Sequence, residues 1–147
     1  MRLRLAPTVT RLRSPILTAE IAERLERTGW SVRVVDMAEV PDRQGILDAF
    51  GRGLRFPDWQ STTWDGLDDA LRDVSWWEPG RRGRAIIVAR AGRLGDEAIP
   101  DWPTVCAILR TATERWKETE TPMGVLVRGR ALGPAAPPPG PAAGQVS

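Results

Sequence analysis

The stretch that decides the fold is Ala85-Ile86-Ile87-Val88-Ala89, five apolar residues in a row. A strand with one face in water alternates apolar and polar residues, whereas this run would be apolar on both faces. Such a run is typical of a strand in a parallel sheet that helices cover on both sides. We therefore expect an α/β fold in which residues 85–89 form the best-buried strand.

The segments around this strand alternate between helical and strand patterns. Apolar residues recur at helical spacing near 14–28, 42–54, 62–74 and 103–116, and short β-branched runs fall at 32–37 and 125–127. Ser14, followed by Pro15, predicts the start of the first helix, and Asp42 is expected to cap the second. Strands separated by helices favour a parallel sheet. The expected architecture is a small three-stranded parallel sheet flanked by about four helices.

The two ends of the chain differ in composition from its middle. Residues 1–13 contain four arginines and no acid, and Pro7 interrupts any early helix, so we expect a flexible basic N-terminal arm. Residues 131–147 are almost entirely Pro, Ala and Gly, which supply no core, and we expect a disordered tail. One folded domain is therefore predicted over residues 14–130.

Several classes of function lack their usual residues. Histidine is absent and Cys106 is the one cysteine, so neither a metal site nor a cofactor is expected. No run of about 18 apolar residues occurs, and the first residues do not resemble an export signal, which predicts a cytoplasmic protein without a membrane segment. Arg81, Arg82 and Arg84 are interpreted as a solvated loop, and no direct contact with nucleic acid is expected.

Charge is distributed unevenly along the chain. The whole chain carries a formal net charge of +2, yet residues 57–79 contain six acids against one base. An acidic segment in a mildly basic protein indicates a basic partner, although a solvated helix face would give the same composition.

The helix expected after Thr62 or Thr63 has two distinct faces. One face is an apolar stripe that we assign to the core: Trp64, Leu67, Leu71 and Val74. The opposite face is charged: Asp65, Asp68, Asp69, Arg72 and Asp73. Because side chains four residues apart are neighbours on a helix, Asp65 and Asp69 project together. They could form the acid/base pair of an enzyme, but such a pair needs a cleft to separate its pKa values, so we do not expect an enzyme.

Residues 56–71 read Phe-Pro-Asp-Trp-Gln-Ser-Thr-Thr-Trp-Asp-Gly-Leu-Asp-Asp-Ala-Leu and resemble the signature of the barstar family. In that family, a Phe/Leu-Pro-acid-aromatic turn leads into a helix that reads Trp/Leu-Asp-Ala-Leu-x-Asp-Cys-Leu. The resemblance extends over roughly residues 18–128 and implies a barstar-like α/β fold.

The resemblance also implies a function. Barstar-like proteins are stoichiometric inhibitors of the antitoxin or immunity type, which fill the active site of a barnase-like ribonuclease with an acidic helix. The resemblance further implies that this protein is a monomer when free and forms a one-to-one complex with a basic ribonuclease. Asp65 and Asp69 match the two aspartates that bind the basic groups of the nuclease, because carboxylates accept hydrogen bonds from cations as phosphates do. The expected partner-binding set also includes Trp59, Asp68, Asp73, Thr63 and Gly66, with Trp59 as the exposed aromatic and Asp68 and Asp73 as long-range attractors.

The sequence departs from the family pattern at two places that bear on the partner. Ser61-Thr62-Thr63 replaces a Gly-x-Asn segment, which restricts the loop before the acidic helix. A third acid that some members carry on the next-to-last helix falls near Thr111, and Glu114 lies one turn later. A barstar-like interaction module retargeted to a partner that is not a nuclease is therefore the alternative interpretation.

Overall fold

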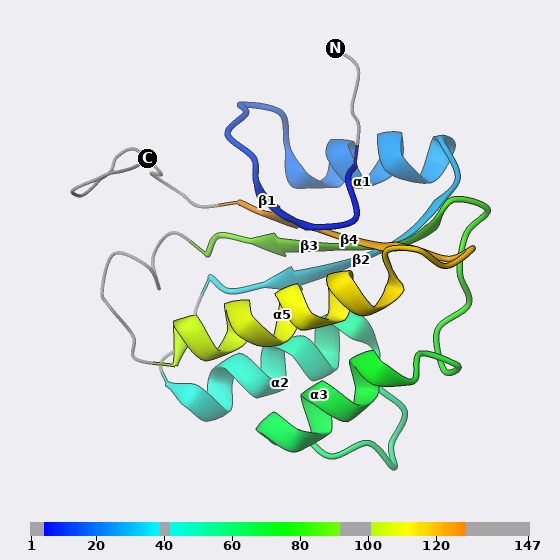
Figure 1. Cartoon of the computed structure of the whole chain (residues 1–147). Helices are drawn as coiled ribbons and strands as arrows, with labels where there is room; N and C mark the ends of the chain where they lie inside the picture. The colour runs from blue at the N-terminus through cyan, green and yellow to red at the C-terminus, as the bar shows by residue number, and fades with distance from the viewer. Residues whose placement is uncertain (1–4, 39–41, 92–100, 129–147) are drawn as a thin grey trace.

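The computed structural model describes residues 5–38, 42–91 and 101–128, which form a parallel sheet with helices on both faces (Figure 1). In chain order the elements are β1 (Val9–Arg11), α1 (Thr18–Arg27), β2 (Trp30–Asp36), α2 (Arg43–Leu54), α3 (Trp64–Arg72), β3 (Gly83–Ala89), α5 (Trp102–Trp116) and β4 (Met123–Val127). The tail expected to be disordered, residues 131–147, lies outside the described residues.

The sheet has four strands in the order β1-β4-β3-β2, and every neighbouring pair is parallel. The inner strand β3 pairs with β2 on one side and β4 on the other, so that Ile86 lies between Arg33 and Val125. All seven residues of β3 are buried. The prediction that residues 85–89 form the best-buried strand is confirmed, but the predicted three-stranded sheet is wrong by one strand.

The additional strand is β1, which lies within residues 1–13, the segment expected to be a flexible arm. Val9 pairs with Val125 and Arg11 with Val127, and the Val125 N–H donates to the Thr8 carbonyl over 3.0 Å. Gly124 permits this approach, because a Cβ there would lie 2.5 Å from Cγ of Leu5. The prediction of a flexible arm is therefore wrong for residues 9–11. These residues bury little apolar surface, and backbone hydrogen bonds to β4 hold them in the sheet.

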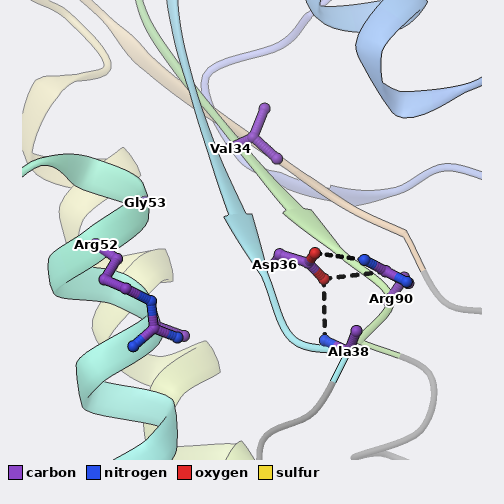
Figure 2. Close-up of a pocket in the computed structure, with 7 residues that line it drawn as sticks. Val34, Asp36, Ala38, Arg52, Gly53 and Arg90 are labelled. Carbon is purple, nitrogen blue, oxygen red and sulfur yellow. Dashed lines mark hydrogen bonds and ion pairs between the residues drawn. The ribbon is translucent and has the colours of Figure 1, made fainter.

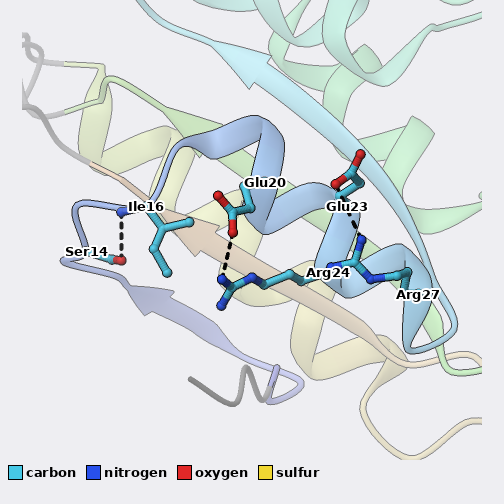
Figure 3. A network of polar contacts seen from close by, with 6 residues as sticks. All are labelled: Ser14, Ile16, Glu20, Glu23, Arg24 and Arg27. Carbon is cyan, nitrogen blue, oxygen red and sulfur yellow. Dashed lines mark hydrogen bonds and ion pairs between the residues drawn. The ribbon is translucent and has the colours of Figure 1, made fainter.

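Among the described elements, α1 is the helix that covers one face of the sheet (Figure 1). It begins at Thr18 and not at the predicted Ser14-Pro15 pair, because the Ser14 hydroxyl accepts the Ile16 N–H (3.1 Å) in a turn before the helix. Buried residues of α1 and the strands beneath it form a small core: Ile21, Leu25, Ala85, Ile87 and Leu126. The outer side of α1 carries two acid-to-arginine pairs at i, i+4 spacing, Glu20 with Arg24 and Glu23 with Arg27 (Figure 3).

Helices α2, α3 and α5 cover the other face of the sheet and enclose the larger core (Figure 1). Asp42 caps α2 as predicted, since its carboxylate accepts the Gly45 N–H over 2.9 Å. Trp77, Phe50, Ile46 and Leu109 are all fully buried in this core. Of these three helices, α3 packs one side on the core and exposes the other side to solvent.

Arg84 lies in this core and not in the solvated loop that we expected. It is the second residue of β3, and only 6% of its surface is exposed. Its guanidinium donates to the carbonyls of Trp77 (2.8 Å) and Val74 (3.2 Å) and stands 5.9 Å from the centre of the Trp77 ring. Arg84 therefore binds the chain that leaves α3 to the first part of the central strand.

Candidate functional site

The start of α3 is held by the loop that precedes it. Thr63 is the N-cap residue, and its hydroxyl accepts the Gly66 N–H over 2.9 Å. The Gln60 side chain reaches from the loop to the Gly66 carbonyl, over 3.0 Å. Of the two threonines that we considered, Thr63 is thus the cap, and Thr63 and Gly66 act together to fix the helix against the loop.

Ser61 and Gly66 lie too close for a side chain on residue 66. A Cβ at Gly66 would stand 2.2 Å from the Ser61 carbonyl oxygen and 2.5 Å from the Ser61 hydroxyl. The sequence pattern led us to expect glycine at position 61, and this chain has Ser61 there, facing a glycine at position 66. Gly66 therefore leaves the space that the Ser61 carbonyl and hydroxyl occupy.

The inner face of α3 packs on the core as predicted. Leu67, Leu71 and Val74 are buried, and Trp64 packs against them while partly exposed. The acidic residues therefore occupy the outer face, where Asp65 and Asp69 are both exposed. Within residues 5–38, 42–91 and 101–128, no ion pair or side-chain hydrogen bond engages either carboxylate. Two adjacent acids are left available to a partner.

The other two acids of this helix have partners inside the protein. Asp68 forms an ion pair of 2.5 Å with Arg72, and the Asp68 side chain is 35% exposed. Asp73 is the C-cap residue, and its carboxylate accepts the Ser75 N–H over 3.1 Å. Their charges add to the field of the acidic face, but their side chains are already engaged.

The carbonyls at the end of α3 are bound by tryptophan side chains, which we did not predict. The Trp76 indole N–H donates to the Ala70 carbonyl (3.1 Å), and the Trp116 indole N–H of α5 donates to the Leu71 carbonyl (2.9 Å). The last carbonyls of a helix have no partner within it, so these bonds complete its C-terminal end. A buried indole N–H needs an acceptor, and this requirement is the sequence signal that could have identified these contacts. The acidic helix is consequently fixed at both ends.

Trp59 stands beside this helix, in the turn after Pro57. Its side chain is 74% exposed, although an indole ring of this size is ordinarily well covered. An exposed aromatic next to an acidic face is typical of residues that become buried when a partner binds. Trp59 therefore lies outside the core, and its ring is accessible from solvent.

The positions considered for a third acidic contact lie on the exposed side of α5. Thr111 and Glu114 line a shallow hollow together with Arg110 and Arg115. This face is therefore mixed in charge, unlike the outer face of α3.

A second hollow opens at the end of β2, between that strand and α2 (Figure 2). Asp36 lines this hollow and accepts two hydrogen bonds from Arg90 (3.0 and 2.5 Å) and one from the Ala38 N–H (3.0 Å). The bond from Arg90 lowers the pKa of the Asp36 carboxyl below its usual value. This ion pair joins the ends of β2 and β3, and the acids of α3 take no part in it.

Among the described residues, no group of three or more His, Cys, Asp or Glu side chains could hold a metal ion. No helix among them is long and apolar enough to cross a membrane.

The fold and the site together define a class: a small α/β protein whose surface carries an acidic helix, bound at both ends and preceded by an exposed aromatic residue. The family model for Barstar (barnase inhibitor) matches residues 30–128, which run from β2 to the end of β4. The chain therefore belongs to the barstar family, whose members are inhibitors and not enzymes. A comparison with curated proteins gives no match. The family match begins after β1 and α1, so neither element is part of it.

Proposed function

We propose that this protein is a stoichiometric inhibitor of a barnase-like ribonuclease, and that the outer face of α3 blocks the active site of that enzyme. The observation that carries the proposal is the pair of exposed carboxylates, Asp65 and Asp69, one turn apart on a helix fixed at both ends. Membership of the barstar family supports it. Carboxylates at this spacing would bind the cations that otherwise hold the phosphates of RNA.

The other residues of the site would support this contact in different ways. Trp59 would pack against the rim of the nuclease and lose its exposure there. Thr63 and Gly66 would hold the helix in place before binding, which lowers the ordering cost on association. Asp73 would add long-range attraction and speed association with a basic partner. An inhibitor of this kind protects the cell that makes it, and we propose that it acts in the cytoplasm as a monomer until it forms a one-to-one complex.

The retargeted module remains the second candidate because of one specific observation. Thr111 and Glu114 lie among arginines on α5, so the surface next to the acidic helix is not uniformly negative. A partner with a mixed charge pattern would fit that face better than a uniformly basic one.

Titration of the protein into a barnase-type ribonuclease tests the proposal directly. We expect activity to fall linearly to zero at one equivalent, and the affinity to weaken as salt is raised, because the contact is between charges. The variant Asp65→Ala/Asp69→Ala should keep its fold and lose inhibition by at least about a hundredfold, as is usual for hot-spot charges.

A matched control is the variant Glu23→Ala/Glu26→Ala on α1, which removes the same charge from the opposite side of the sheet. It should inhibit nearly as well as the unaltered protein. If the Asp65/Asp69 variant inhibits normally, the site assignment is wrong. If the unaltered protein leaves every nuclease of this class active, the nuclease target is wrong and the retargeted module is favoured.

A further inference from the structure

The outer face of α3 carries one cation, Arg72, among its acids. Successive residues of an α-helix are about 100° apart around its axis, which places Arg72 between two carboxylates: about 60° from Asp69 and about 40° from Asp68. Asp69 precedes it by three residues and Asp68 by four, and both spacings bring side chains into contact on a helix. Arg72 therefore has two acids within its reach.

The structure shows which acid Arg72 takes. Its guanidinium binds the Asp68 carboxylate at 2.5 Å, and within the described part of the chain no hydrogen bond or ion pair joins it to Asp69. An acid four residues before a base is the favourable order on a helix. Arg72 is 53% exposed, and an exposed pair of this kind adds little to stability.

We infer that Asp68 is a positioning residue, which holds Arg72 off Asp69 and so keeps the Asp69 carboxylate available to a cationic partner. The inference rests on the proposed function, because it concerns the same site. Without Asp68, the guanidinium has Asp69 as its remaining neighbour on this face. A basic partner would then have to displace Arg72 before it could bind Asp69, and one of the two contact acids would be occupied in the free protein.

A double-mutant cycle separates this role from simple charge attraction. The four proteins are the unaltered chain, Asp68→Asn, Arg72→Gln and the double variant, and the measurement is the dissociation constant for a ribonuclease that the unaltered chain inhibits. We expect Asp68→Asn to weaken binding about three- to tenfold when Arg72 is present, and to weaken it less in the Arg72→Gln background, where only the attraction by the Asp68 charge is lost. If Asp68 only attracts the partner, Asp68→Asn weakens binding by the same factor with and without Arg72. This result would overturn the inference.

Asn at position 68 keeps the size of the side chain and changes only its charge, so the fold should persist. Circular dichroism and the urea midpoint of each variant provide the check. The variant Asp73→Asn is a matched control, because it removes an acid at the end of the same helix that does not bind Arg72. Its effect on binding should be the same with and without Arg72.

A second measurement needs no partner. In a crystal structure of the free Asp68→Asn protein, we expect the Arg72 guanidinium to bind the Asp69 carboxylate. A guanidinium that stays away from Asp69 in that structure overturns the inference, whatever the nuclease assay shows. Failure of the unaltered chain to inhibit any ribonuclease would instead overturn the proposed function, so the two failures are distinguishable.

Discussion

Replacing Gly66 with alanine should destabilise the protein, although the same change in a helix interior usually adds about 1 kcal/mol of stability. The added methyl carbon would stand 2.2 Å from the Ser61 carbonyl oxygen and 2.5 Å from the Ser61 hydroxyl. Relief of such a clash by moving the helix or the loop costs about 1–3 kcal/mol. The backbone oxygen cannot rotate away as a flexible side chain could. We therefore expect a net loss of up to about 2 kcal/mol in the free energy of unfolding.

Urea unfolding followed by tryptophan fluorescence would measure this loss. The control is Gly51→Ala on α2, where the new Cβ would be 3.2 Å from the flexible Thr62 side chain and 3.7 Å from Phe56. That variant should be neutral or gain up to about 1 kcal/mol. Adding Ser61→Gly to Gly66→Ala should recover part of the loss, because glycine removes the hydroxyl and frees the loop backbone. A Gly66→Ala protein as stable as Gly51→Ala would refute the reasoning.

Two other predictions concern stability. Thr63→Ala should lower the free energy of unfolding by about 1 kcal/mol through loss of the cap, while Thr62→Ala, which removes no cap, should change it less in the same urea assay. The hydrogen bond from Arg90 lowers the pKa of the Asp36 carboxyl in the folded protein. The pair therefore contributes its full stability above the pKa of the unfolded carboxyl, about 3.9. This stability is lost as the pH falls through the lower pKa of the folded protein. The difference in stability between the unaltered protein and Asp36→Asn should stay constant from pH 5 to 8 and shrink in acid, and a difference that changes near neutrality would contradict this assignment.

Elements with a strong local pattern were predictable from sequence. The apolar run at 85–89 and the stripe of α3 report burial directly, because each such residue loses water-exposed apolar surface on folding. Strand β1 has no such signal: three residues pair with a strand more than a hundred residues away, and the pairing uses backbone groups that every sequence has. Arg84 was misassigned for a related reason, since its burial depends on two carbonyls that only the folded chain brings together.

Some features of the candidate site could also be predicted from sequence, and others could not. The spacing of Asp65 and Asp69 and the cap at Thr63 follow from helix geometry, so sequence was sufficient for them. Sequence alone did not decide between Asp68 and Asp69 as the partner of Arg72, because both spacings bring side chains into contact on a helix. The contact of Ser61 with Gly66 also required coordinates, since it depends on the path of the loop.

The position of the first strand has a consequence for how the protein is made. β1 lies beside β4, so it has no partner until synthesis has passed Val127. The bond from Trp116 to α3 likewise forms only after α5 has left the ribosome. A chain interrupted shortly after α3 would contain every acidic residue of the proposed binding face, yet lack the strand, helix and indole that hold that face in shape. The binding surface is therefore completed only after β4 has been made, and translation products that stop before β4 should not compete with the folded protein for its partner.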